Sequence, residues 1–123
     1  MDSKVTIGLI QAHHDLDGGE PVEAHKRAAI EKHVRLIREA KRRGAQIVCL
    51  QEIFYGPYFC TEQTPKWYAA TERIPDGPTT KLMQDLAKEL GIALPVELRA
   101  LAMPVGSASA RSSSRSFKRL SDG

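Results

Sequence analysis

The sequence predicts an α/β fold, because two short apolar segments flank one amphipathic helix. Lys4–Ala12 (KVTIGLIQA) alternates apolar with smaller or polar residues and then becomes apolar, as a strand does. Gln46–Leu50 (QIVCL) is a continuous apolar run, consistent with a strand buried on both faces. A strand, a helix and a strand with short connections form a βαβ unit, so we expect these two strands to be parallel neighbours.

The helix between the strands is predicted to begin at Pro21 and to span about 20 residues. Its apolar residues recur at steps of three and four: Ala29, Ile30, Val34, Ile37 and Ala40. Gly44 is well placed to end it.

A second helix is predicted after an aromatic loop. Residues 53–78 are loop-like and hold six of the seven Phe, Tyr and Trp residues of the chain. Thr79 or Thr80 offers a helix N-cap, and Gly91 closes the apolar stripe that follows. The stripe consists of Leu82, Met83, Leu86, Ala87 and Leu90. Ile92–Leu94 then begins another strand.

Composition fits one small domain with a tail of different character. The chain has 123 residues, and residues 1–94 hold 13 Lys or Arg and 13 Asp or Glu, which cancel. Residues 95–123 are rich in Ser, Arg and Ala and hold five basic and two acidic residues, so we expect a disordered tail. The neutral globular part argues against nucleic-acid binding there. No long apolar run and no signal peptide are present, which predicts no membrane span and a cytoplasmic protein.

Glu52 is the residue best placed for chemistry. It lies just past the carboxyl end of the second predicted strand, the edge at which ligands bind in open α/β sheets. It is either a solvated loop carboxylate or a general base whose pKa is raised by an aromatic loop that excludes water.

The other reactive residue types carry weaker patterns. Cys49 lies inside an apolar strand and Cys60 among aromatic residues, so neither has the electropositive setting of a nucleophile. His13 and His14 lie near two aspartates, but adjacent side chains of an extended segment point in opposite directions. We therefore predict no metal site and no cofactor.

The string Ala45–Cys60 (AQIVCLQEIFYGPYFC) resembles the carbon–nitrogen hydrolase (nitrilase) superfamily. The resemblance begins at KVTIGLIQA and runs to about Leu94. The loop GPYFCTEQ and the segment IPDGPTTKLMQDLAKELG are most similar to N-carbamoyl amidohydrolases, namely β-ureidopropionase and N-carbamoylputrescine amidase.

The resemblance implies that residues 1–94 are the N-terminal part of an α-β-β-α sandwich that forms homo-oligomers. It implies hydrolysis of N-carbamoyl amines or amino acids by a Glu base, a Lys and a Cys nucleophile. Glu52 matches the glutamate, whereas no residue here matches the lysine or the cysteine. Tyr55 and Tyr58 are candidate substrate-binding residues or packing residues of the loop.

Part of a sandwich leaves an apolar sheet face and a strand edge exposed, which favours aggregation. The loss of the family pattern at Pro95 suggests a frameshift for residues 95–123. Two alternatives stay open beside the hydrolase. One is an inactive fragment, and the other is a small adaptor whose basic tail binds nucleic acid.

Overall fold

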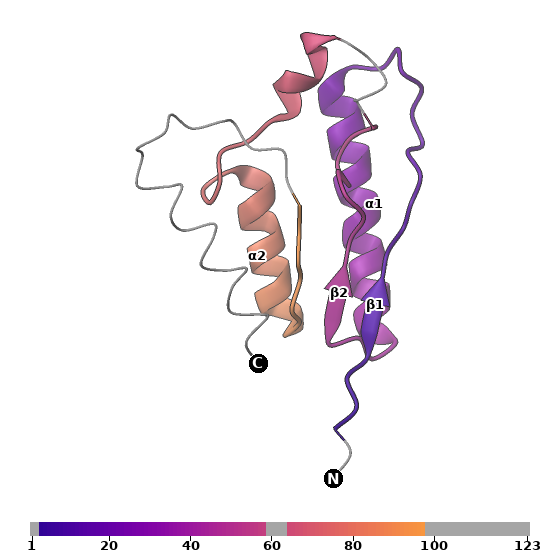
Figure 1. Ribbon diagram of the computed structural model, residues 1–123, viewed down its shortest axis with the longest axis vertical. Coiled ribbons are helices and arrows are strands. Elements are labelled where there is room, and N and C mark those ends of the chain that lie inside the picture. Colours follow the sequence, from indigo (N-terminus) through magenta and orange to yellow (C-terminus); the bar gives the residue numbers. More distant parts are fainter. Residues whose placement is uncertain (1–2, 59–63, 98–123) are drawn as a thin grey trace.

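The computed structural model describes residues 3–58 and 64–97 (Figure 1). Its elements follow the order β1 (Ile7–Leu9), α1 (Val22–Arg42), β2 (Ile47–Cys49), the 3-10 helix η2 (Pro65–Ala70) and α2 (Pro78–Leu90). The predicted tail lies almost wholly outside these residues, as does Cys60. The domain boundary at residue 94 therefore stays a prediction.

The strands form a parallel sheet, as the βαβ prediction required. β1 pairs with β2 in the register Ile7 to Ile47 and Leu9 to Cys49. The segment after α2 adds to the other edge of β2, since Val48 donates its N–H to Ala93 O at 2.9 Å. Ala93 N in turn donates to Gln46 O at 2.9 Å. The segment predicted to begin a further strand thus pairs in parallel with β2.

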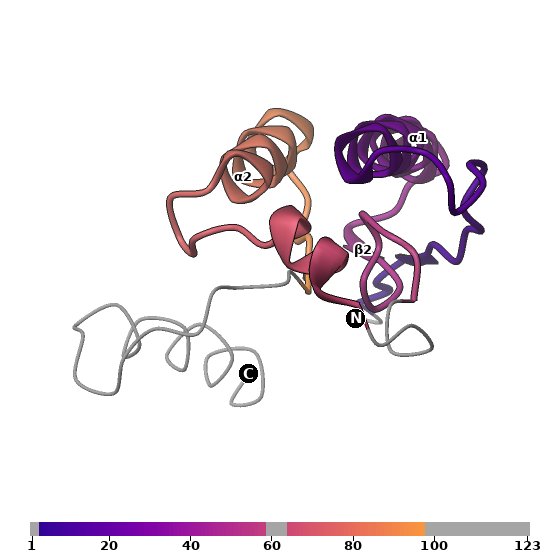
Figure 2. The ribbon, with the colours of Figure 1, turned by 90° about the horizontal axis from the view of Figure 1, so that it is seen from above.

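Both helices lie on one side of this sheet, as Figure 2 shows. α1 presents a buried stripe to the sheet, and Gly44, with a φ of 92°, follows its end. α2 ends at Gly91 in the left-handed conformation. The glycine stops predicted from the sequence are therefore confirmed.

The start of α2 differs from the prediction. Its N-cap is Gly77, and neither Thr79 nor Thr80 caps it. The side chain of Glu72 replaces a threonine cap, accepting a hydrogen bond from Thr79 N at 2.8 Å and from Thr79 Oγ1 at 2.5 Å. A carboxylate at a helix N-terminus satisfies an unpaired backbone donor and complements the helix dipole.

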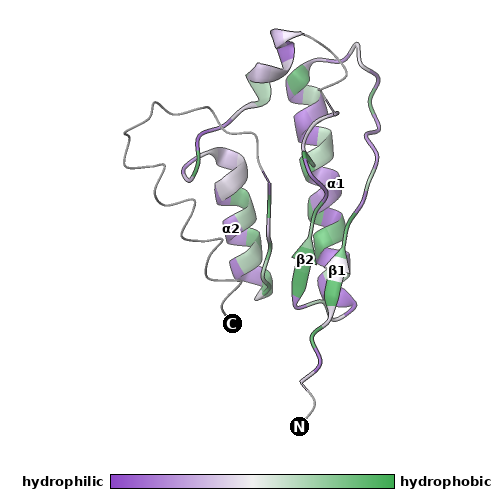
Figure 3. Cartoon of the chain, viewed as in Figure 1, coloured by the Kyte–Doolittle hydropathy of each residue, from purple (hydrophilic) through white to green (hydrophobic). Residues whose placement is uncertain are grey.

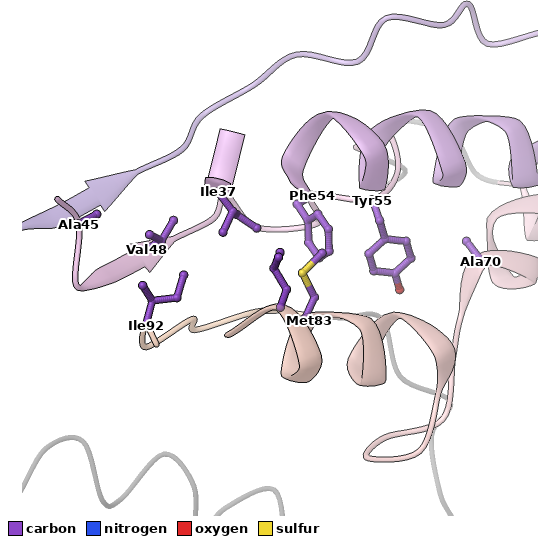
Figure 4. Packing of buried hydrophobic residues seen from close by; sticks show 9 residues of the cluster. Ile37, Ala45, Val48, Phe54, Tyr55, Ala70, Met83 and Ile92 are labelled. Atoms are coloured by element: carbon purple, nitrogen blue, oxygen red, sulfur yellow. The ribbon is translucent and has the colours of Figure 1, made fainter. Parts of the chain in front are cut away.

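The apolar core lies between the sheet and the two helices (Figure 4). Ile37 of α1, Val48 of β2 and Phe54 are fully buried. Figure 4 shows the rings of Phe54 and Tyr55 between α1 and α2, with Met83 of α2 beside Phe54. The aromatic loop therefore contributes to the core that joins the two helices.

The opposite face of the sheet is apolar and open. Val5, Ile7 and Leu9 are exposed, and Leu9 has 81% of its surface accessible. Figure 3 shows β1 and β2 as apolar segments next to the banded helices. Ile47 and Cys49 are only half-buried, so β2 is well covered on one face rather than on two. The exposed apolar face expected from the resemblance is present.

Candidate active site

The candidate site lies at the carboxyl end of the parallel sheet, where Glu52 follows β2 after Leu50 and Gln51. Glu52 is the first residue of a turn that runs to Tyr55. This placement agrees with the sequence prediction, because ligands bind at the carboxyl edge of open α/β sheets.

The side chain of Glu52 is exposed in the described part of the chain. The aromatic residues after it do not shield it, since Phe54 and Tyr55 point into the core instead. The expectation that the aromatic loop excludes water from this carboxylate is therefore wrong for the described residues.

The backbone beside Glu52 is strained. Ile53 has a φ of 53°, in the left-handed region that β-branched residues avoid. Such a conformation costs about 1–2 kcal/mol and persists only where the surroundings fix it. Strain of this kind is frequent at active sites, and here it immediately follows the candidate base.

The two tyrosines predicted to bind substrate lie in different environments. Tyr55 is 1% exposed and packs edge-on against Phe54, with ring centroids 5.4 Å apart. Tyr58 is 64% exposed at the end of the described loop. Tyr58 therefore faces solvent, whereas Tyr55 belongs to the core, and a substrate-binding role for either stays a prediction.

The sequence analysis assigns no role to Gln51 or His33. In the structure Gln51 precedes Glu52 and His33 contacts Gln51. The amide of Gln51 forms two hydrogen bonds with the peptide groups of Ala12, each 2.5 Å long. The ring Nε2 of His33, a buried residue of α1, lies 3.4 Å from Gln51 Oε1. The helical periodicity placed His33 on the same stripe as Ala29 and Ile37, so that signal was available.

Three histidines lie close enough for their charges to interact. They are His14, in the loop before α1, and His25 and His33 of α1. Burial lowers the pKa of His14, and the positive charge that His33 and His25 acquire on protonation lowers it further. His25 is buried edge-on against Trp67, with ring centroids 5.5 Å apart, and neither of its ring nitrogens has a hydrogen-bond partner among residues 3–58 and 64–97. Within residues 3–58 and 64–97, no three His, Cys, Asp or Glu side chains are arranged to hold a metal ion.

The predicted polar loop before α1 holds ion pairs rather than a ligand set. Lys32 Nζ lies 2.8 Å from Asp15 Oδ1, and His13 Nε2 lies 3.1 Å from the same atom. Lys32 also donates to the carbonyl of His13 at 2.9 Å. These contacts attach the loop to α1.

A family comparison gives the strongest evidence on what this site belongs to. A model of the carbon–nitrogen hydrolase family matches residues 6–102. The chain belongs to the carbon–nitrogen hydrolase family. The match includes Glu52 and the whole of the described sheet, and it runs past Leu94, where the sequence motifs predict that the resemblance ends.

Individual relatives agree with the branches that the motifs indicated. The chain is 45% identical to N-carbamoylputrescine amidase of Solanum lycopersicum over 62 residues, covering 50% of this chain and 21% of that protein. It is 34% identical to β-ureidopropionase of Arabidopsis thaliana over 91 residues, covering 73% of this chain and 22% of that protein. Omega-amidase NIT2-B of Xenopus laevis is 45% identical over 65 residues, covering 53% of this chain and 22% of that protein.

The chain thus spans about a fifth of the length of the curated relatives that it matches. Among the described residues, no helix is long and apolar enough to cross a membrane.

Proposed function

We propose that this chain supplies the general base, Glu52, of a carbon–nitrogen hydrolase acting on N-carbamoyl amines or amino acids. The observation that carries the proposal is the position of Glu52. It lies at the carboxyl edge of a parallel sheet, beside strained backbone, within the segment matched by the family. The names of the relatives support N-carbamoyl compounds as the substrate class.

The chemistry requires partners that this chain does not supply. Glu52 takes the proton of a cysteine thiol, and the thiolate attacks the carbamoyl carbon. A lysine stabilises the negative oxygen of the tetrahedral intermediate. The C–N bond to the amine then breaks, and water hydrolyses the carbamoyl thioester to carbon dioxide and ammonia.

Two consequences follow for the isolated chain. In the family resemblance no residue of this chain matches the nucleophile or the lysine, so we expect residues 1–123 alone to be inert. The exposure of Glu52 is consistent with an active site whose remaining residues this chain does not supply. We also propose that the whole protein is a homo-oligomer and that its reaction uses no cofactor.

The test is a chimera in which this chain replaces the corresponding segment of the tomato N-carbamoylputrescine amidase. We expect ammonia release from N-carbamoylputrescine by the chimera, and none from the chain alone. Glu52→Gln in the chimera lowers kcat by at least about a hundredfold, because it removes a general base. Glu23→Gln, which changes an exposed glutamate of α1, is the matched control and leaves kcat unchanged.

The outcomes separate the candidates. A chimera that keeps its activity after Glu52→Gln contradicts the assignment of the base. A chimera that folds but is inactive before any substitution indicates that this chain has lost the family's function. Faster turnover of N-carbamoyl-β-alanine than of N-carbamoylputrescine favours a β-ureidopropionase specificity.

A further inference from the structure

We propose that Gln51 is a positioning residue for Glu52. Its side-chain amide extends the β1–β2 pairing beyond the backbone ladder and fixes the turn that carries the carboxylate. This inference rests on the proposed role of Glu52 as the base.

The first support is the geometry of the pairing where the ladder ends. Ile10 donates its N–H to Cys49 O at 2.9 Å, toward the carboxyl end of the two strands. Ala12, two residues on, donates its N–H to Gln51 Oε1, and Gln51 Nε2 donates to Ala12 O, both at 2.5 Å. The side-chain amide thus occupies the place that a peptide group of β2 would have in a longer strand.

The orientation of this amide is determined by its partners. One acceptor and one donor of the same residue, Ala12, face it, so exchanging the oxygen and nitrogen of Gln51 would put like groups together. Oε1 also faces Nε2 of His33 at 3.4 Å, and His33 Nδ1 is 2.7 Å from Ala29 O. A neutral His33 can donate to Ala29 O or to Gln51 Oε1 but not to both, so the connection that Gln51 makes through two hydrogen bonds is the one to the end of β1, at the residue before Glu52.

The second support is the turn itself. Ile53, on the other side of Glu52, is held in the left-handed conformation, and Phe54 and Tyr55 beyond it are buried. A strained residue persists only when the surrounding structure over-determines its conformation. The buried aromatic residues fix the downstream side, and the Gln51 amide fixes the upstream side.

The chain contains a matched control at the opposite end of β2. Gln46 accepts a hydrogen bond from Thr6 N at 3.1 Å with its side-chain oxygen, so it also links β2 to β1. It lies at the amino end of the strand, away from the turn of Glu52. Substitution of Gln46 removes a side-chain hydrogen bond between β1 and β2 but leaves the Gln51–Ala12 hydrogen bonds next to Glu52 in place.

The experiment uses nuclear magnetic resonance on residues 1–123 and measures the backbone conformation of Ile53. A positive φ brings the amide proton close to its own α-proton and gives a strong intraresidue cross-peak. We expect Gln51→Leu to abolish the strong cross-peak at Ile53 and to shift the Glu52 amide. Gln46→Leu is expected to leave both signals unchanged. A left-handed Ile53 in the Gln51→Leu chain overturns the proposal.

A second variant decides the question if Gln51→Leu does not fold. Gln51→Glu keeps the acceptor but replaces the donor with a charged oxygen that faces Ala12 O. Protonation restores a donor, so the Ile53 cross-peak is expected to be absent at about pH 7 and to return at about pH 4. The unsubstituted chain, measured at both pH values, controls for effects of pH that do not depend on residue 51. A Gln51→Glu chain with the same spectrum at both values overturns the proposal.

The backbone readout is joined by kinetics in the chimera, where Gln51→Leu is expected to lower kcat with little change in KM and Gln46→Leu is expected to change neither. A Gln51→Leu chimera with unchanged kcat overturns the positioning of Glu52 by Gln51. If the chimera experiment excludes Glu52 as the base, the cross-peak still reports whether Gln51 fixes the turn. If the cross-peak is indifferent to Gln51, the assignment of the base is untouched.

Discussion

The two faces of the sheet differ in what covers them. On the helix side Val48 is fully buried, and Gly8 lets α1 approach closely, because a Cβ there would lie 3.1 Å from the Cβ of Ala40. On the other side Val5, Ile7 and Leu9 are exposed. The apolar residues of β1 thus face away from the helices. An alternating strand pattern identifies an apolar face without telling whether the same chain covers it.

The largest expected effect is the contrast between one core residue and one residue of the open face. Ile37→Ala removes a fully buried side chain between α1 and the sheet and is expected to cost about 2–5 kcal/mol of unfolding free energy. Leu9→Ala changes an exposed side chain and is expected to stay within about 0.5 kcal/mol. Urea denaturation followed by circular dichroism measures both. Equal losses at the two positions would mean that the open face is covered in solution.

Sedimentation velocity at several concentrations sharpens the same contrast. If the open face drives self-association, Leu9→Ser reduces it, whereas the exposed substitution Gln84→Ser on α2 does not.

The second effect concerns the ion pair that joins the two helices on the covered side. Lys26 of α1 contacts the carboxylate of Glu72, which also caps α2 through Thr79. Glu72→Gln removes the charge that compensates Lys26 and is expected to cost about 1–3 kcal/mol. Denaturation of Glu72→Gln, Lys26→Met and the double variant gives the coupling between them. No coupling would contradict a direct pair.

The pH dependence of this pair has a definite sign. Burial by itself raises the pKa of Glu72, but the hydrogen bonds from Lys26 and Thr79 outweigh it, and the pKa is lowered. The stabilisation is therefore fully present above the ordinary carboxyl pKa and is lost as the pH falls through the lowered value. Stability of the Glu72→Gln chain is expected to depend less on pH in this acidic range.

The smallest effect is expected at a solvent-exposed pair. Hydrogen bonds from Arg42 and Arg43 lower the pKa of Glu39 to about 2. Its contribution to stability is present above its ordinary value of 4.5 and is lost as the pH falls toward about 2. A carboxyl titration followed by nuclear magnetic resonance at low salt checks this value. Arg42→Ala and added salt both shift the titration upward, because exposed pairs are screened. A titration near 4.5 at low salt would contradict the pair.

Periodicity was sufficient to predict most of the fold. The steps of three and four residues placed α1 and α2, and glycines marked where each ends. The apolar runs placed β1, β2 and their parallel pairing. The 3-10 helix η2 was missed, because Pro65–Ala70 is too short to show a repeat and lies within an aromatic loop. The threonine cap was wrong, because the carboxylate of Glu72, seven residues before Thr79, accepts from a backbone N–H in the first turn of the helix instead.

The position of the candidate site could be predicted from the sequence, but the exposure of Glu52 and the contacts around it could not. A glutamate after an apolar strand places Glu52 at the sheet edge. Its exposure could not be predicted, since it depends on whether Phe54 and Tyr55 point toward it or into the core. The Gln51 amide pairs with Ala12 across 39 positions of the sequence, and no local pattern reports such a contact.

The strand order also bears on how the chain acquires its shape during synthesis. β1, β2 and the segment around Ala93 lie side by side in the order in which they are made. Each new strand therefore pairs with a neighbour that has already been synthesised, and in the part of the chain that the structure describes no later segment inserts between earlier strands. Folding from the N-terminus as the chain is translated can add one strand and one helix at a time. The edge at Ala93 is then the place where growth of the sheet would continue.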